Sequence, residues 1–123
     1  MPDSEYFFDT YALIEVFKGN ENYKPYSKVK VITSYLHLYE LYYNLLKEYD
    51  EVKIKPFFNR IKGFCINLEF NWIIESCKFR SKHKKNDLSY ADCLGYIIAK
   101  NKKIKFLTGD KEFENLDNVE FVK

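Results

Sequence analysis

Apolar and polar positions along the chain alternate between strand-like and helix-like spacing. Residues 6–8 form a short apolar run, Tyr-Phe-Phe, that fits a buried strand. Between residues 11 and 18 the apolar side chains recur at helical spacing, and Gly19-Asn20 is a typical helix end. The same reading predicts strands at 29–33, 64–70, 104–107 and 119–122, and helices at 34–49, 56–62, 72–82 and from 89 onward.

This order of elements predicts an α/β fold. Strands that alternate with helices form βαβ units, hence a mostly parallel sheet with helices on both faces. Apolar and polar residues alternate at 64–70, a pattern with one wet face that places this strand at a sheet edge. No linker rich in Gly, Ser or Pro divides the 123 residues, so we expect residues 1–123 to form a single domain.

Composition excludes several classes of protein. Hydrophobic residues make up 46% of the chain, which is too many for a disordered chain, and the net charge of +2 provides no bulk field that attracts nucleic acid. The 3 cysteines include no Cys-x-x-Cys motif, which argues against a disulfide framework or a zinc site, so we expect buried, reduced thiols. No signal peptide is visible at residues 1–5 and no apolar run is long enough for a membrane span, so the expected location is cytoplasmic.

Acidic residues follow two of the predicted strands. Asp9 comes directly after the first strand, and Asp110 follows the strand at 104–107 after two further residues. Ligands of parallel sheets bind outside the carboxyl ends of the strands, so both carboxylates would face one cleft if the two strands are neighbours. The hydroxyls of Thr10 and Thr108 would lie beside them. Either aspartate can instead simply cap the helix that follows it.

Two further carboxylates lie on predicted helices. Glu40 is the only charged residue between 34 and 46, in a helix that we expect to be buried because it is apolar almost all round. A lone buried carboxylate needs a partner, which can be a wet strip, a tyrosine hydroxyl or a cation. Asp92 lies one turn into the helix that begins at Ser89, at a spacing close to that of a capping box.

One explanation accounts for all four acids. The βαβ topology would bring Asp9, Glu40, Asp92 and Asp110 together, where they would repel each other without a cation between them. Mg²⁺ and Mn²⁺ prefer such oxygen ligands. A site of this kind suits the hydrolysis of phosphodiesters, in which metal ions activate water and neutralise charge on the phosphate.

With these residues the chain resembles the PIN-domain family of metal-dependent ribonucleases over essentially its whole length. The resemblance lies in four ordered motifs: an opening strand that ends in Asp-Thr, a Thr or Ser before a helix that bears Glu-Leu, an acidic third motif, and a strand that leads into Thr-x-Asp. In this sequence they are Phe8-Asp9-Thr10, Thr33-Ser34 with Glu40-Leu41, residues 88–94 around Asp92, and Leu107-Thr108-Gly109-Asp110 with Phe113.

The resemblance implies a three-layer α/β/α sandwich around a parallel five-stranded sheet. It implies that Asp9, Glu40, Asp92 and Asp110 hold one or two Mg²⁺ or Mn²⁺ ions for the hydrolysis of RNA. Thr10 and Thr108 would hydrogen-bond these carboxylates or metal-bound water. Many small members are VapC-like toxins of toxin–antitoxin pairs and form homodimers, which would add a small antitoxin protein as a partner, whereas other members process RNA.

Two features depart from the family pattern. Tyr11 is bulky where the family usually has a small residue, so it would narrow the cleft or stack on a base. The chain also has only two arginines, fewer than many members carry near the site. Neither departure removes a proposed metal ligand, but both bear on which substrate the site prefers.

A basic stretch precedes the helix that carries Asp92. Residues 78–85 include five cations and one histidine. If this segment borders the acidic site, it could hold an RNA backbone. A solvated helix end, whose cations complement the helix dipole, is the alternative. The residues predicted to contact RNA are Arg80, Lys82, Lys84 and Lys85.

Other functions compete with the nuclease. The first is a non-catalytic PIN-like module that binds RNA or serves as a scaffold, which the loss of one acid would have favoured. A phosphoryl-accepting receiver domain would need an acidic pair after the first strand and an aspartate after the third, but Asp9 stands alone and Glu69-Phe70-Asn71 offers none. A nucleotide-binding enzyme is weaker still, since the 4 glycines form no phosphate loop.

Overall fold

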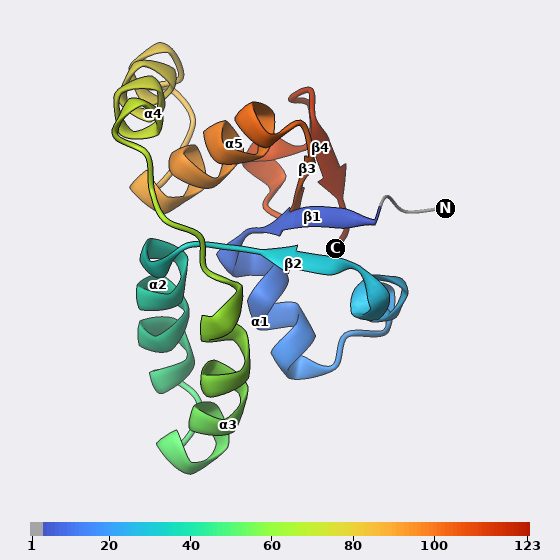
Figure 1. The fold of residues 1–123 in the computed structure, drawn as a ribbon. Helices are drawn as coiled ribbons and strands as arrows, with labels where there is room; N and C mark the ends of the chain where they lie inside the picture. Colours follow the sequence, from blue (N-terminus) through green and yellow to red (C-terminus); the bar gives the residue numbers. More distant parts are fainter. Residues whose placement is uncertain (1–3) are drawn as a thin grey trace.

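The computed structural model describes residues 4–123, in which four parallel strands form one sheet (Figure 1). Residues 1–3, part of the segment in which no signal peptide is visible, lie outside the described residues. The strand order is β2-β1-β3-β4, so the first and third strands are neighbours at the centre. The strands are β1 (Glu5–Phe8), β2 (Lys30–Ile32), β3 (Lys105–Thr108) and β4 (Val119–Phe121).

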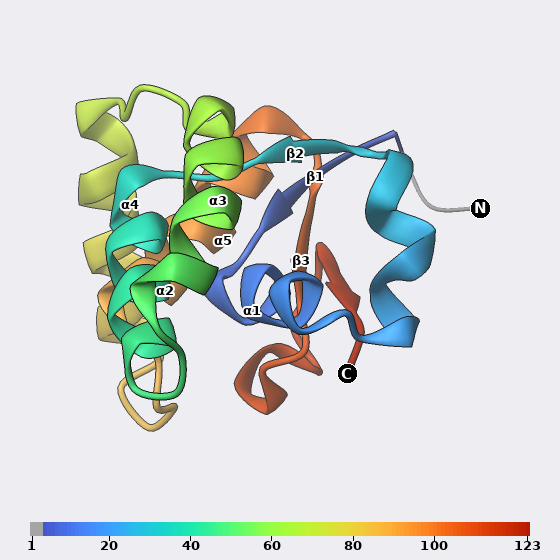
Figure 2. The same cartoon turned by 90° about the horizontal axis from the view of Figure 1, so that it is seen from below.

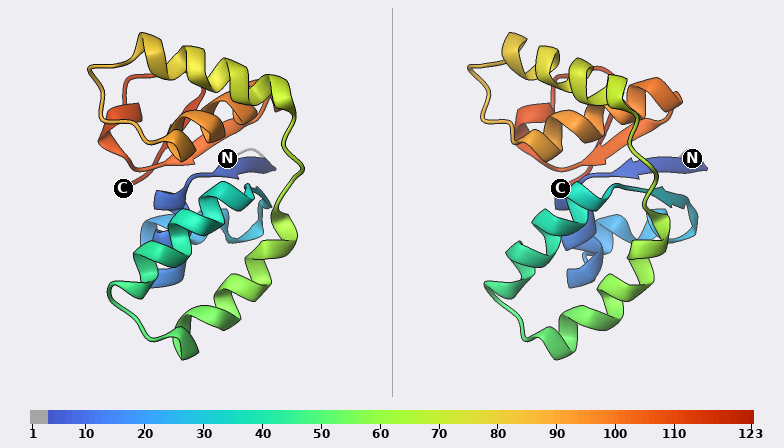
Figure 3. Two further views of the ribbon diagram at one scale, coloured as in Figure 1. Left: turned by 90° about the vertical axis from the view of Figure 1, so that its left-hand side faces the viewer. Right: turned by 60° about the vertical axis from the view of Figure 1, so that its left-hand side comes forward.

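Helices cover both faces of the sheet. Figure 3 shows β1 between α4 and α5 on one side and α1, α2 and α3 on the other. Seen from below, α1 lies between the α2–α3 pair and the short helix η1 (Figure 2). The helices are α1 (Thr10–Lys18), η1 (Glu21–Lys28), α2 (Tyr35–Leu46), α3 (Glu51–Ile61), η2 (Lys62–Phe64), α4 (Phe70–Lys82), α5 (Tyr90–Lys102) and η3 (Lys111–Phe113).

The central strand β1 has a hydrophobic core on each side. Successive side chains of a strand point to opposite faces, and a central parallel strand is buried on both. Tyr6 and Phe8 accordingly pack into the core beneath α1, α2 and α3, whereas Phe7 packs with Phe106 into the core beneath α5. The predicted parallel α/β sheet flanked by helices is thus confirmed.

The expected fifth strand is absent from the described residues. In the segment predicted as an edge strand, only a single bridge between Cys65 and Thr33 extends the sheet beyond β2. Phe70 already begins α4 and is 76% exposed. This segment carries the chain from α3 on one face to α4 on the other (Figure 1), so it crosses the sheet edge instead of running along it. Its alternating pattern therefore does not represent a strand.

Other boundaries differ less. Helix α3 begins at Glu51, five residues before the predicted start at Pro56, and the short helix η1 was not predicted from the sequence. The side chain of Asn20 caps η1 by accepting a hydrogen bond from the Asn22 N–H. A proline in a polar segment hides this helix from a reading based on hydrophobic spacing.

All three cysteines are free, but they differ in burial. Cys93 is buried, and burial raises the pKa of its thiol to about 11. Cys65 is half-buried and Cys77 is exposed, so the expectation of buried thiols is wrong for Cys77. Within residues 4–123, none of the helices has both the length and the apolar character needed to cross a membrane.

Gly95 allows α5 to pack closely on the sheet. A methyl group at this position would lie 2.7 Å from His37 Nε2, 2.7 Å from Phe7 Cε1 and 2.8 Å from Phe106 Cε1. We expect Gly95→Ala to lower the free energy of unfolding by about 1–2 kcal/mol, because overpacking outweighs the better helix propensity of alanine. Urea denaturation measures this, with Gly63→Ala, whose methyl would meet nothing within 4 Å, as the matched control. A Gly95→Ala protein as stable as the parent would contradict the packing described here.

Candidate active site

Asp9 lies at the carboxyl end of the central strand β1, where it precedes α1. Its side chain is only 1% exposed. The hydroxyl of Thr108, at the end of the neighbouring strand β3, donates a hydrogen bond of 2.8 Å to Asp9 Oδ2. The adjacent strands therefore bring the two predicted residues into direct contact, and this contact fixes how the Asp9 carboxyl group is oriented.

Asp110 follows β3 at the same sheet edge. Its backbone N–H donates to Thr108 Oγ1 at 3.0 Å, so one threonine hydroxyl connects Asp9 with Asp110. The Asp110 side chain accepts a hydrogen bond of 3.0 Å from the Glu112 N–H, and Asp110 is the N-cap of η3. The capping role considered for Asp110 is confirmed, and it holds a carboxylate beside the acidic site.

Asp92 lies in the first turn of α5 and is 8% exposed. A complete capping box is present: the Asp92 N–H donates to Ser89 Oγ at 3.0 Å, and the Ser89 N–H donates to Asp92 Oδ2 at 2.9 Å. The capping box considered for Asp92 is thus also confirmed. The box fixes the carboxyl group against the start of α5 and leaves Oδ1 for another partner.

Glu40 lies on α2 and is half-buried, so the expectation of a fully buried helix around it is wrong. One side of α2 packs into the core through Leu38, Leu41 and Leu45. The opposite side exposes a row of tyrosines at helical spacing, Tyr35, Tyr39 and Tyr43, that are 65%, 75% and 60% exposed. Tyrosine and leucine look alike in a hydrophobic pattern, but a tyrosine hydroxyl is well placed in water.

The four predicted acids are close enough to act on one another electrostatically. Burial raises the pKa of Asp9 well above its ordinary value, and the negative charges of Asp92 and Glu40 raise it further, against the lowering effect of the hydrogen bonds from Thr108 and from the Thr10 backbone. Burial likewise raises the pKa of Asp92 to about 6, with additional contributions from Asp110 and Glu40. The fold therefore gathers all four at one edge of the sheet.

His37 is a member of this site that sequence reasoning missed. Its imidazole is fully buried, and burial lowers its pKa to about 3, so the ring is neutral. Nδ1 lies 2.6 Å from Ser34 Oγ, and Nε2 lies 3.8 Å from Asp9 Oδ1. A signal was present in the sequence, since His37 precedes Glu40 by three residues and thus shares a side of the helix with it.

Unsatisfied polar atoms gather beside Asp9. Among residues 4–123, the buried side-chain atoms that lack a hydrogen-bond partner are Asp9 Oδ1, Thr10 Oγ1 and His37 Nε2. Buried polar atoms are rarely left unpaired in folded proteins, and exceptions point to a role or to a bound group. The three atoms lie at Asp9 itself, at its chain neighbour and at the imidazole that faces it.

The donor set fits a hard divalent cation. The described side chains, as they stand, place no three of His, Cys, Asp or Glu close enough together to hold a metal ion directly. The negative charges of Asp92 and Glu40 nevertheless raise the pKa of Asp9, those of Asp110 and Glu40 raise the pKa of Asp92, and Asp9 Oδ1 is buried without a partner. A cation that prefers oxygen ligands and retains several waters, as Mg²⁺ and Mn²⁺ do, would satisfy both features.

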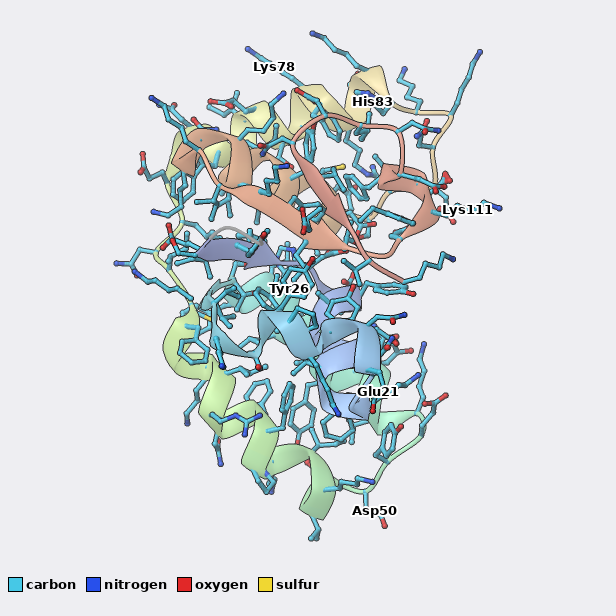
Figure 4. All side chains as sticks on the ribbon, turned by 90° about the vertical axis from the view of Figure 1, so that its right-hand side faces the viewer. Glu21, Tyr26, Asp50, Lys78, His83 and Lys111 are labelled. Atoms are coloured by element: carbon cyan, nitrogen blue, oxygen red, sulfur yellow. The ribbon has the colours of Figure 1, made fainter. Side chains whose placement is uncertain are left out.

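The basic stretch lies at the end of α4 and in the loop before α5. Figure 4 shows Lys78 and His83 at the end of the molecule opposite Asp50. Arg80 Nε donates a hydrogen bond of 3.1 Å to the Leu88 carbonyl, and its guanidinium lies 4.2 Å from the centre of the Tyr90 ring. The other three residues predicted to contact RNA, Lys82, Lys84 and Lys85, are exposed.

Two hollows mark the surface. The larger, about 560 Å³, lies among α1, η1, β2 and α3, and none of the four acids lines it. The smaller, about 350 Å³, lies between α2 and the start of α5 and includes Glu40 in its wall. The residues that line it are Leu36, Tyr39, Glu40, Tyr43, Ser89, Tyr90 and Ala91.

Solved structures share this fold. A chain of a toxin–antitoxin complex from Klebsiella pneumoniae matches with a TM-score of 0.75 and 20% identity, over 94% of this chain and 95% of that one. VapC20 of Mycobacterium tuberculosis, described as a sarcin-ricin loop cleaving toxin, matches with a TM-score of 0.74 and 16% identity, over 96% and 99% of the two chains. PAE2754 from Pyrobaculum aerophilum matches with a TM-score of 0.72 and 18% identity, over 95% and 90%.

Sequence comparison places the chain in a family. No match was found among curated proteins. The family model described as "PIN domain" matches residues 6–119, which include all four acids and Thr108. The protein belongs to the PIN domain family.

Proposed function

We propose that this protein is a metal-dependent endoribonuclease that hydrolyses RNA phosphodiester bonds. The observation that carries the proposal is the gathering of Asp9, Glu40, Asp92 and Asp110 at one sheet edge, where burial and mutual repulsion raise the pKa of Asp9 and Asp92. Folding brings these charges together at an energetic cost, and such strongly shifted pKa values are typical of functional sites. The family to which the chain belongs supports the same conclusion.

The residues have separable roles in this proposal. Asp9 and Asp92 are oriented by hydrogen bonds from Thr108 and Ser89, so they would supply fixed carboxylate ligands to Mg²⁺ or Mn²⁺. Glu40, half-buried on α2, and Asp110, which caps η3, would complete the set. When bound, the cation would supply an activated water and neutralise charge that develops on the phosphate.

Two buried groups would support Asp9. Thr108 holds Oδ2, and the neutral His37 faces Oδ1 at 3.8 Å. The hydroxyl of Thr10, buried beside them without a partner, would be free to hydrogen-bond water at the metal. These groups would keep the carboxylate in one orientation while the substrate binds, which is the usual work of the residues around metal ligands.

The proposed biological setting is a toxin–antitoxin pair. Two of the similar structures are a toxin–antitoxin complex and VapBC2 from Rickettsia felis bound to a DNA fragment from their promoter, the latter with a TM-score of 0.73 and 14% identity over 97% of this chain and 99% of that one. We therefore propose a small antitoxin protein as a partner and a homodimer as the assembly, in the cytoplasm.

Metal-dependent cleavage of RNA tests the activity. Purified protein should cleave a fluorogenic single-stranded RNA in the presence of Mn²⁺ and lose this activity with EDTA. Cleavage that persists with EDTA would contradict the proposal, because the proposal assigns the activation of water to the bound cation.

The basic stretch provides a second test, which concerns substrate binding. Replacing Lys82, Lys84 and Lys85 together by alanine is expected to weaken RNA binding and to flatten its salt dependence. Each lost phosphate contact should reduce the slope of log K against log[salt] by about 0.7. Fluorescence anisotropy measured at several salt concentrations gives this slope, and Mn²⁺ binding should not change.

The control removes the same charge elsewhere. Lys24, Lys28 and Lys55 are also exposed but lie on η1 and α3. Their triple alanine variant should bind RNA with a nearly normal slope. Equal losses in the two triple variants would mean that only net charge matters, and an unchanged affinity in the first would leave the stretch as a solvated helix end.

A further inference from the structure

We propose that the hollow between α2 and the start of α5 is a subsite for an unpaired nucleobase of the RNA, with Tyr39, Tyr43 and Tyr90 as its stacking surfaces. This inference rests on the proposed function and extends it to the substrate. The hollow has a volume of about 350 Å³, and its wall combines these three rings with Glu40. The site thus lies directly beside the acidic cluster.

The exposure of the three rings is the first argument. Tyr39, Tyr43 and Tyr90 are 75%, 60% and 69% exposed, although each has a large apolar face. They come from two elements, since Tyr39 and Tyr43 lie one turn apart on α2 and Tyr90 opens α5. Aromatic rings that border one hollow from two sides form a surface on which a flat base can stack, whatever its sequence.

Cations paired with the rings provide the second argument. The Arg80 guanidinium lies 4.2 Å from the centre of the Tyr90 ring, and Lys47 Nζ lies 4.7 Å from the centre of the Tyr43 ring. Each cation lies over one face of its ring, so a base would stack on the opposite face while the cation neutralises its phosphate. Lysine is depleted at the core of protein–protein interfaces, so Lys47 over the Tyr43 ring favours a nucleotide over a second copy of this chain.

The position of Glu40 and Ser89 determines where the RNA backbone lies relative to the acidic cluster. Both residues line the hollow, Glu40 is one of the four acids, and Ser89 holds the Asp92 carboxylate. A base seated here therefore brings its own sugar–phosphate backbone next to the acidic cluster. A double-stranded RNA cannot offer such a base without unpairing it, so the subsite selects single-stranded segments.

The test measures binding separately from cleavage. In an Asp9→Asn background, which should not cleave RNA, a fluorescein-labelled single-stranded RNA of about eight nucleotides is titrated by anisotropy, site sizes of this order being usual for single-strand binders. Tyr39→Leu, Tyr43→Leu and Tyr90→Leu should each weaken binding by about tenfold, equivalent to ~1.4 kcal/mol. The phenylalanine variants, which keep the ring, should stay within about twofold of the parent.

Two controls make the result specific. Tyr35 is 65% exposed on the same side of α2 but does not line the hollow, so Tyr35→Leu should leave binding unchanged. An abasic oligomer of equal length retains the phosphates and removes the bases, so its affinity should not depend on the tyrosines. The subsite would be overturned if Tyr35→Leu weakened RNA binding as much as the other leucine variants do, or if those variants also bound the abasic oligomer more weakly.

The remaining outcomes separate the two proposals. If the parent binds RNA and the three leucine variants bind it equally well, the subsite is wrong and the nuclease proposal stands. If the parent binds neither the normal nor the abasic oligomer, both the nuclease proposal and the subsite fail. If light scattering shows that the leucine variants convert a dimer into a monomer, the tyrosines form an interface between copies and the subsite is overturned.

Discussion

Asp9→Asn is expected to abolish RNA cleavage while the protein melts at the same or a higher temperature. Asp9 is 1% exposed, and its carboxyl group is desolvated and repelled by Asp92 and Glu40, so the folded state gains when the charge is removed. The asparagine carbonyl can still accept the hydrogen bond from Thr108. Loss of the charged ligand should lower activity by at least about 100-fold, since even outer groups of metal sites contribute 10–100-fold.

Metal-induced stabilisation shows whether the loss arises at the metal site. A ligand that binds only the folded state stabilises it, by about 2.7 kcal/mol at a concentration of 100 Kd. Thermal unfolding should therefore shift upward with Mn²⁺ in the parent and not in Asp9→Asn. Asp50→Asn, the same change at an exposed residue at the start of α3 (Figure 4), is the control and should retain both the shift and the activity. Full activity in Asp9→Asn would contradict the site.

Asp92→Asn is expected to stabilise the metal-free protein by an amount that grows with pH. The pKa of Asp92 is raised from 3.8 to about 6, mainly by burial. An aspartate in the unfolded chain releases its proton near pH 4, whereas folded Asp92 retains it until about pH 6. The folded state therefore binds more protons in this window, so the parent loses stability as the pH rises from about 4 through about 6.

The variant lacks this titration. The amount by which its free energy of unfolding exceeds that of the parent should therefore be small near pH 4 and reach its full value above pH 6. A shift of this size corresponds to a difference of about 3 kcal/mol. Asparagine retains an acceptor for the Ser89 N–H, and the loss of a charge at the helix N-terminus adds an opposing offset of about 0.3–1 kcal/mol. Urea denaturation with EDTA at several pH values measures the difference.

Asp50→Asn again serves as the reference, since it makes the same chemical change at an exposed position at the start of another helix, α3. A difference between parent and Asp92→Asn that does not vary from pH 4 to pH 7 would mean that the folded protein does not raise the pKa of Asp92, either by burial or through neighbouring negative charges. It would also remove the electrostatic argument for a cation at this site.

Much of the fold was predictable because local pattern and global fold agree there. Phe7 and its neighbours form a continuous apolar run because β1 is buried on both faces, and Ser34 and Ser89 begin helices because their hydroxyls cap them. Residues 64–70 mislead for the opposite reason. Their alternation satisfies a local rule, but a strand also needs a partner, and here only the bridge from Cys65 is formed.

The candidate site was predictable only in part. Asp9 and Asp110 follow strands, so topology alone places them at one edge, provided that β1 and β3 are neighbours. The half-exposure of Glu40 depends on which side of α2 meets the core, which residue types do not reveal when tyrosines and leucines alternate. The role of His37 depends on a tertiary contact with Asp9, of which local spacing shows only the three-residue separation between His37 and Glu40.

The most direct test of the account compares the rate of RNA cleavage by the parent and by Asp92→Asn as Mn²⁺ is added. Both proteins are prepared identically, so a contaminating nuclease would be present in both. We expect a rate that rises with Mn²⁺ in the parent and returns to zero with EDTA, and no cleavage by the variant at any Mn²⁺ concentration. Equal rates in the two proteins would contradict the account. Failure of the parent both to cleave RNA and to bind Mn²⁺ would contradict it as well, and would favour a non-catalytic RNA-binding or scaffold module.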